Sequence, residues 1–207
     1  NNKKKFLSDI SPKFRNKFLL VGDFVENINF SEDFDKKPDL YVSNFVFEHI
    51  KDPFSVTRKI LKEAKDDAII VIGVPGSEFL YENFRFDQLS HQHYQQFTKH
   101  SLRIMIERSG GEIIKMSTNY PMWGHIAVAF KKKKNNRNKN YNTSKIFAVN
   151  QIENSLLIFK KEMDLLKKKL NSIRRKNFFG YGAAQNFPTF ANFFKDDFPF
   201  EIILDDD

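Results

Sequence analysis

Residues 39–72 read DLYVSNFVFEHIKDPFSVTRKILKEAKDDAIIVI and predict a strand, a helix and a second strand. The apolar runs Leu40–Ser43 and Ala68–Ile72 are bounded by turn residues, which is typical of parallel strands covered on both faces. Between them, Pro53 suits a first helical turn and Asp52 suits its cap. A strand–helix–strand unit of this kind implies a right-handed crossover in an α/β sheet.

The flanking segments extend this sheet in both directions. Phe18–Val21 is a further apolar run of the strand type, and Thr98 opens a second helix that ends at a Gly-Gly pair. The strand-like segments Glu112–Ser117 and His125–Phe130 follow, and only a short turn separates them. We therefore expect a parallel sheet that is finished by an antiparallel hairpin.

The second half of the chain opens with the polar, basic run Lys131–Asn140, which we interpret as a linker. Ser144–Lys176 then has the period of a long helix with an a/d seam. That seam fits a coiled-coil dimer, and it equally fits a helix that lies between two domains of one chain. Additional apolar residues favour docking against a domain. The seam comprises Val149, Ile152, Leu156, Phe159, Met163, Leu166, Leu170 and Ile173, and the additional residues are Leu157, Ile158 and Leu165.

After the long helix, Asn177–Asn186 contains Gly180-Tyr181-Gly182-Ala183 between a strand-like and a helix-like stretch. Glycines at such a turn allow the backbone to approach a ligand, and a helix N-terminus can hold phosphate. The same pattern is also that of a tight turn without a ligand. A strand-like segment, Phe200–Leu204, closes the unit.

Composition narrows the function classes. The chain has 207 residues, of which 41% are hydrophobic and 29% charged, so it is expected to fold. It has no cysteine, which excludes disulfides and thiolate chemistry. No apolar run is long enough to span a bilayer and no signal pattern opens the chain, so we expect a cytoplasmic protein without a membrane partner. The net charge is +8, but no nucleic-acid-binding motif accompanies it, so no nucleic-acid partner is expected.

The polar run Ser90–Thr98 carries His91 and His93, one residue apart. Because the pKa of histidine lies close to physiological pH, this pair is a candidate acid/base site. The alternative is a surface loop with two ordinary histidines. No carboxylate or third histidine stands at a convincing spacing from the pair, so we expect no metal site.

Residues 39–53, with Glu-His-Ile after a strand and Asp-Pro before a helix, resemble the fourth-strand region of class I S-adenosylmethionine-dependent methyltransferases. Residues 97–114 are similar to the last helix and the following strand of those enzymes. Ser90–His93 together with Gly180–Ala184 resembles the nucleotide-sugar C-methyltransferase group, and Leu204–Asp206 fits that group as well. The resemblance spans most of residues 18–207.

The resemblance implies methyl transfer from S-adenosylmethionine to a carbon of a nucleotide-linked keto-sugar, through base-assisted formation of an enolate. It makes His93 the base. His91 would orient the loop or contact the substrate, and Tyr94 would contact the enolate oxygen or pack. Gln92 stands where family members can have Glu; it can form hydrogen bonds but cannot take up a proton.

The resemblance also implies binding residues. Asp9 would take the ribose hydroxyls of the cofactor, Asp23 would meet the adenine amino group, and Asn44 follows a strand end where ligands sit in open α/β sheets. The glycine-rich loop that follows the first strand in this class is not found in the sequence. Substrate binding falls to the Gly180-Tyr181-Gly182-Ala183 turn.

We therefore expect a truncated chain in four parts. These are a partial methyltransferase domain (1–130), a basic linker (131–143), the long amphipathic helix (144–176) and the start of a second Rossmann-like domain (177–207). The expected partners are a nucleotide-sugar substrate and a second copy bound through the long helix. Three alternatives are a methyltransferase acting on oxygen or nitrogen, a non-catalytic protein that associates through the long helix, and a basic nucleic-acid-binding protein.

Overall fold

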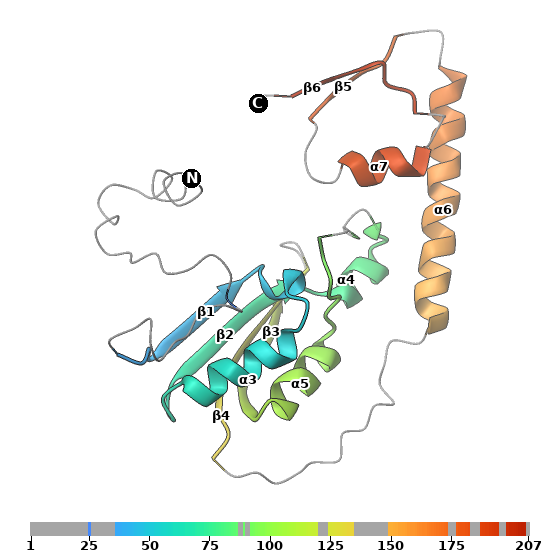
Figure 1. The fold of residues 1–207 in the computed structure, drawn as a ribbon. Helices are drawn as coiled ribbons and strands as arrows, with labels where there is room; N and C mark the ends of the chain where they lie inside the picture. Colours follow the sequence, from blue (N-terminus) through green and yellow to red (C-terminus); the bar gives the residue numbers. More distant parts are fainter. Residues whose placement is uncertain are drawn as a thin grey trace.

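The computed structural model describes residues 25, 36–86, 89, 92–119, 124–134, 149–173, 177–182, 187–194 and 198–205. Within these residues the main element is a four-stranded sheet with the strand order β1-β2-β4-β3. β1 is parallel to β2, whereas β4 is antiparallel to both β2 and β3 (Figure 1). The strands are β1 (Leu40–Asn44), β2 (Ile69–Pro75), β3 (Gly111–Asn119) and β4 (His125–Lys132).

This architecture confirms the mixed α/β sheet and its antiparallel final hairpin. Both apolar runs of the strand–helix–strand unit are strands, and β2 continues three residues further than Ile72 to Pro75. β4 continues to Lys132, two residues into the segment predicted as a linker, because Lys131 and Lys132 pair with the start of β3. The predicted strand Phe18–Val21 lies outside the described residues.

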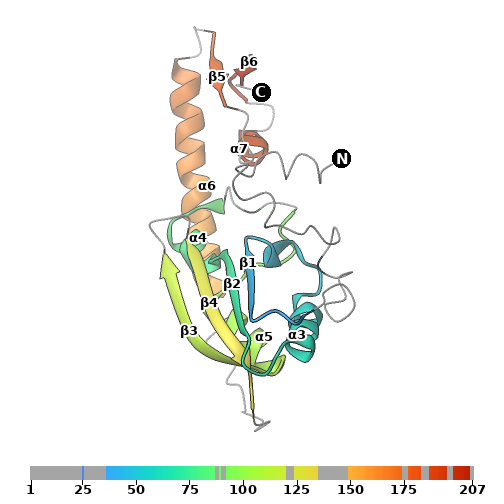
Figure 2. The same cartoon turned by 90° about the vertical axis from the view of Figure 1, so that its left-hand side faces the viewer.

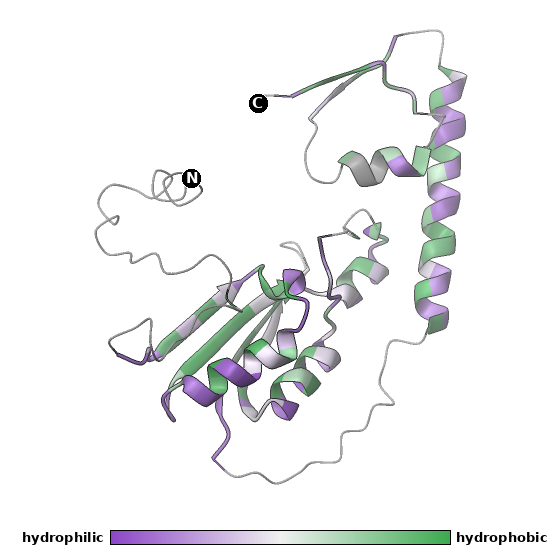
Figure 3. Ribbon diagram, viewed as in Figure 1, coloured by the Kyte–Doolittle hydropathy of each residue, from purple (hydrophilic) through white to green (hydrophobic). Residues whose placement is uncertain are grey.

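Two helices cover one face of the sheet, α3 (Pro53–Glu63) and α5 (Lys99–Arg108) (Figures 1 and 2). Alternate residues of the two central strands point to these helices, as the two-residue period of a strand requires. Most of β2 is accordingly hydrophobic (Figure 3). The core that results contains Val56, Ile60, Leu61, Ile70, Ile72, Val74, Leu102, Met105, Ile106, Ile126, Val128 and Phe130.

Both helices begin where the sequence predicts. The Asp52 carboxylate accepts a hydrogen bond from the backbone N–H of Ser55 at 3.0 Å. The Thr98 hydroxyl accepts one from the N–H of Ser101 at 3.0 Å, and the Ser101 hydroxyl accepts one from the N–H of Thr98 at 2.9 Å. Such reciprocal capping satisfies donors that a helix start leaves unpaired. Gly110, with φ of +96°, then turns the chain from α5 into β3.

The C-terminal part contains a separate two-stranded parallel sheet, in which β5 (Phe179–Tyr181) pairs with β6 (Ile202–Leu204). α7 (Phe187–Phe194) lies between these strands in the sequence, so a second strand–helix–strand unit is present as predicted. It is short, and each strand has three residues.

The long helix α6 (Val149–Ser172) stands beside α4 (Ser77–Glu82) and α7 (Figure 1). The centroid of the Phe159 ring lies 5.3 Å from the ring centroid of Phe86 and 4.7 Å from that of Phe193. The helix therefore contacts other elements of its own chain, as the interdomain interpretation predicts. Leu157, Ile158 and Leu165, which were expected to broaden the docked stripe, are instead exposed. Among the described helices, none has the length and apolarity needed to cross a membrane.

The composition of the core predicts that truncating two leucines has different effects on stability. Leu102 of α5 is fully buried, whereas Leu40 of β1 is 57% exposed. Leu102→Ala should lower the free energy of unfolding by about 2–5 kcal/mol because it leaves a cavity. Leu40→Ala is the matched control and should cost less than about 1 kcal/mol. Urea denaturation followed by circular dichroism measures both, and equal losses would contradict this assignment of the core.

Candidate functional site

A turn directly after β1 forms the first half of the site. β1 ends at Asn44, and Phe45 follows with φ of 54°, which is unusual for a bulky residue. Its N–H donates to the carbonyl of Gly73 in β2 at 2.9 Å, so the reversal is tied to the neighbouring strand. Residues 46–51, here called the post-β1 turn, contain the short helix η2 (Phe47–His49).

A second segment reaches the same edge of the sheet from the end of β2. Gly76 follows this strand and pairs in parallel with Phe97 in an isolated bridge. The N–H of Ser77 also donates to the carbonyl of Phe97 at 2.8 Å. These contacts hold residues 92–96, here called the histidine segment, near the carboxyl ends of β1 and β2. Ligands of open α/β sheets bind at these ends.

Three hydrogen bonds join the histidine segment to the post-β1 turn. Nδ1 of His49 lies 2.9 Å from the backbone carbonyl oxygen of Gln92. The N–H of Gln95 donates to the carbonyl of Glu48 at 3.1 Å, and its side-chain amide donates to the carbonyl of Lys51 at 3.0 Å. Two loops that are more than forty residues apart in the sequence thus form one unit.

Glu48 is the buried acid of this unit. Only 2% of its surface is exposed, and its Oε2 has no hydrogen-bond partner among the described residues. Burial raises the pKa of this carboxyl, while its backbone hydrogen bond and nearby His49 act in the opposite direction. A buried carboxylate without a full set of partners costs stability, and such groups cluster at functional sites.

Two imidazoles lie beside this acid. The rings of His49 and His93 meet edge to face, with 4.9 Å between their centroids. A carbonyl oxygen can only accept, so Nδ1 of His49 carries the proton that it donates to Gln92. The other ring nitrogen, Nε2, lies 3.9 Å from Oε1 of Glu48 and is the atom of this ring that faces the carboxylate. Burial and the neighbouring His49 lower the pKa of His93, which favours its neutral form.

His93 is the one member of this cluster that was predicted from the sequence as a site residue. Each of Glu48, His49 and His93 brings one ligand-type atom, and these atoms lie within 4.8 Å of one another. Sequence spacing around His93 could not reveal two partners that stand more than forty residues earlier. The available signal was the Glu-His pair at the end of a predicted parallel strand, since such ends converge on one edge of a sheet.

The other predicted catalytic residues are arranged differently. Gln92 is exposed and contributes its backbone carbonyl to the unit. Tyr94 is 57% exposed, with the Lys51 ammonium 5.5 Å from its ring centre. His91 lies outside the described residues.

Of the predicted cofactor contacts, Asn44 is the last residue of β1. Its side chain fills the space beside Gly73, because a Cβ added at Gly73 would lie 2.2 Å from Oδ1 of Asn44. Asp9 and Asp23 lie outside the described residues.

The predicted substrate turn has a local structural explanation. A Cβ on Gly180 would meet Cδ1 of Ile203 at 2.5 Å, so glycine allows β5 and β6 to pack. Gly182 has φ of +91°, and its N–H donates to the carbonyl of Leu204 at 2.7 Å. Tyr181 is 72% exposed, and Ala183 lies outside the described residues.

Residues 6–116 match the model of a family described as a methyltransferase domain. The chain belongs to this methyltransferase family. The matched range includes the post-β1 turn, the histidine segment and the whole Glu48–His49–His93 cluster. No curated protein shows significant similarity to the chain.

Solved structures resemble this methyltransferase domain only distantly. A chain from the complex between the Haloferax volcanii Trm112 methyltransferase activator and a protein assigned as a methyltransferase has 14% identity and a TM-score of 0.46, with 57% of this chain and 62% of that chain covered. An S-adenosylmethionine-dependent methyltransferase from Clostridium acetobutylicum has 11% identity and a TM-score of 0.45, with 63% of this chain and 72% of that chain covered. The mitomycin 7-O-methyltransferase has 16% identity and a TM-score of 0.46, with 62% of this chain and 38% of that chain covered. The chain thus spans less than two thirds of the first of these structures.

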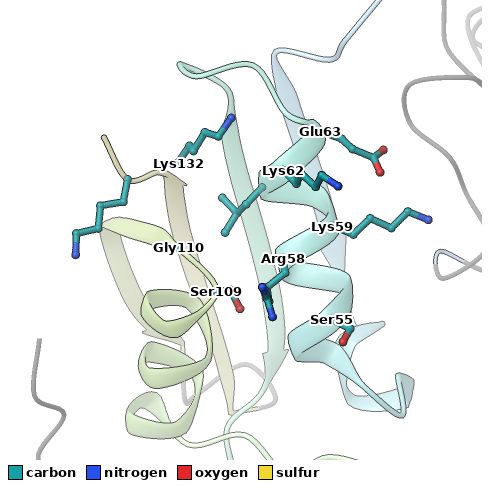
Figure 4. A pocket seen from close by; sticks show the side chains of 10 residues that line it. Ser55, Arg58, Lys59, Lys62, Glu63, Ser109, Gly110 and Lys132 are labelled. Atoms are coloured by element: carbon teal, nitrogen blue, oxygen red, sulfur yellow. The ribbon is translucent and has the colours of Figure 1, made fainter. Parts of the chain in front are cut away.

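The methyltransferase domain also has a basic cavity of about 620 Å³ that runs along α3 from Ser55 to Glu63 (Figure 4). Arg58, Lys59 and Lys62 of α3 line one side, and Lys132 at the end of β4 lines another. The Lys132 ammonium pairs with Asp66 at 3.0 Å. Since Lys131 is the register partner of Ile69 at the start of β2, the Lys132 side of this cavity lies at the edge of the sheet opposite to the histidine segment.

The buried acid yields a stability prediction. Glu48→Gln should raise the free energy of unfolding by roughly 1 kcal/mol, because it removes a charge that burial disfavours. The measurement is urea denaturation at neutral pH with a chelator present, so that no cation compensates the carboxylate. The exposed Glu82 supplies the control, and Glu82→Gln should change the value by less than about 0.5 kcal/mol. A marked loss of stability in Glu48→Gln would show that the carboxylate is well paired.

Proposed function

We propose that the chain acts in an S-adenosylmethionine-dependent methyltransferase that methylates a carbon of a nucleotide-linked keto-sugar. Family membership supports methyl transfer. The observation that carries the proposal is the histidine segment, hydrogen-bonded to the post-β1 turn at the carboxyl edge of the sheet. The keto-sugar acceptor rests on the sequence resemblance of Ser90–His93 and Gly180–Ala184 to sugar C-methyltransferases.

Carbon becomes a competent nucleophile only as an enolate, so the site needs a base for the proton alpha to the ketone. His93 is suited to this task because the lowered pKa leaves its ring neutral, with a lone pair. Its contact with the His49 ring and the hydrogen bonds of the segment restrict its position. Bound S-adenosylmethionine would supply the electrophilic methyl group.

The residues at the carboxyl end of β1 fit a polar, ring-bearing cofactor. Asn44 offers an exposed amide there, and the rings of Phe45 and His125 lie 5.1 Å apart beside it. Gly73 leaves the space that Asn44 and His125 use. Asn44 would therefore hold the cofactor. Gln92 stands where related enzymes can have glutamate, and its contribution here is the backbone carbonyl that fixes His49.

The proposal predicts a separation between binding and turnover. His93→Asn should reduce methyl transfer by about 10²–10⁴-fold and leave the affinity for S-adenosylhomocysteine unchanged. Calorimetry measures the affinity, and mass spectrometry of a thymidine-diphosphate keto-sugar measures turnover. His100→Ala on α5 is the control and should preserve both.

Equal losses of cofactor affinity and turnover in His93→Asn would contradict the base assignment. Product NMR decides the acceptor atom, since a new carbon-bound methyl supports the proposed chemistry. An oxygen-bound or nitrogen-bound methyl would instead support the alternative small-molecule methyltransferase.

A further inference from the structure

We propose that Glu48, His49 and His93 form a binding site for one divalent transition-metal ion of the Zn²⁺ type. Their ligand atoms lie within 4.8 Å of one another at the carboxyl edge of the sheet. This inference goes beyond the proposed methyl transfer and does not depend on it, because it concerns binding by the chain's own side chains.

The carboxylate gives the first argument. Glu48 is 2% exposed, and Oε2 lacks a hydrogen-bond partner among the described residues, although buried polar atoms normally have one. Oε1 faces Nε2 of His49 at 3.9 Å, which is too long for a hydrogen bond. A cation between these atoms would satisfy a carboxylate that the protein itself leaves incompletely paired.

The tautomer of His49 gives the second argument. Its Nδ1–H is committed to the carbonyl oxygen of Gln92 at 2.9 Å, so Nε2 is the nitrogen with the lone pair. Metal-bound histidines almost always donate their other ring N–H to a carbonyl, a carboxylate or water, which fixes the ring. The hydrogen bond to Gln92 already supplies this support and aims the free nitrogen at Glu48.

The donor set indicates which ion fits. Two neutral imidazoles and one carboxylate suit Zn²⁺ and similar transition ions, whereas Mg²⁺ prefers oxygen ligands. Zn–N bonds of about 2.0–2.1 Å place ligand atoms roughly 3.3 Å apart, so the cluster must contract on binding. His49 is exposed and His93 is partly exposed, and both rings can rotate to allow this. Three protein ligands leave a position for water or a substrate oxygen.

Metal binding has a consequence for the proposed base. The coordinating nitrogen of His93 can hold either the ion or a proton, because both use the same lone pair. The metal-loaded and base-competent forms of the site are therefore alternatives, and added Zn²⁺ should suppress methyl transfer that uses His93 as the base.

The test is a titration of the full chain with Zn²⁺ against a chromophoric chelator, with no cofactor or sugar present. We expect one ion per chain. Glu48→Gln, His49→Asn and His93→Asn should each weaken binding by at least about tenfold, and His100→Ala should leave it unchanged. Co²⁺ should give visible absorption bands of a four- or five-coordinate site, and a large excess of Mg²⁺ should not displace the ion.

Absence of saturable Zn²⁺ binding would overturn the proposal, as would binding that survives all three substitutions. Circular dichroism verifies that His49→Asn is folded, so loss of binding in this variant cannot be attributed to global unfolding. The losses in Glu48→Gln and His93→Asn, which keep the His49–Gln92 hydrogen bond, show that the effect does not come from that bond alone. The readout needs no turnover. A chain that binds Zn²⁺ but transfers no methyl group when it is free of metal would refute the proposed function alone. A metal-free chain that transfers a methyl group but then binds no Zn²⁺ would refute the metal site alone.

Discussion

The hydrogen bonds between the histidine segment and the post-β1 turn are the constraint on which the site depends. The bond from His49 to the carbonyl of Gln92 and those from Gln95 to the turn hold the histidine segment, and with it His93, beside Glu48. They convert two loops into one surface at the carboxyl edge of the sheet. Loops are well suited to carry functional groups when a rigid scaffold positions them.

The scaffold explains why these loops meet. β1 and β2 are parallel neighbours, so the chain leaves both strands at the same edge. The left-handed backbone conformation of Phe45 starts the post-β1 turn, and the bridge between Gly76 and Phe97 anchors the histidine segment. The cap at Thr98 then starts α5 immediately after the histidine segment. A buried, incompletely paired Glu48 is the kind of stability cost that proteins tolerate at functional sites.

Much of this fold was predictable from the sequence because its signals are local. Continuous apolar runs identified β1 and β2, and Asp52 and Thr98 identified both helix starts. The site was only partly predictable. Unusual composition drew attention to His93, but its partners come from a distant turn, and only the parallel pairing of the strands brings them together. Spacing in one segment cannot report such a contact.

The orientation of His49 decides whether this site exists, and long-range ¹⁵N–¹H NMR of the imidazoles in the metal-free chain measures its tautomer directly. His49→Asn would assign the signal. The structure predicts the Nδ1–H tautomer, because that nitrogen donates to the carbonyl of Gln92 and Nε2 faces Glu48. An Nε2–H tautomer would mean that His49 does not donate to Gln92 and that no lone pair faces Glu48, and it would contradict the arrangement of the site.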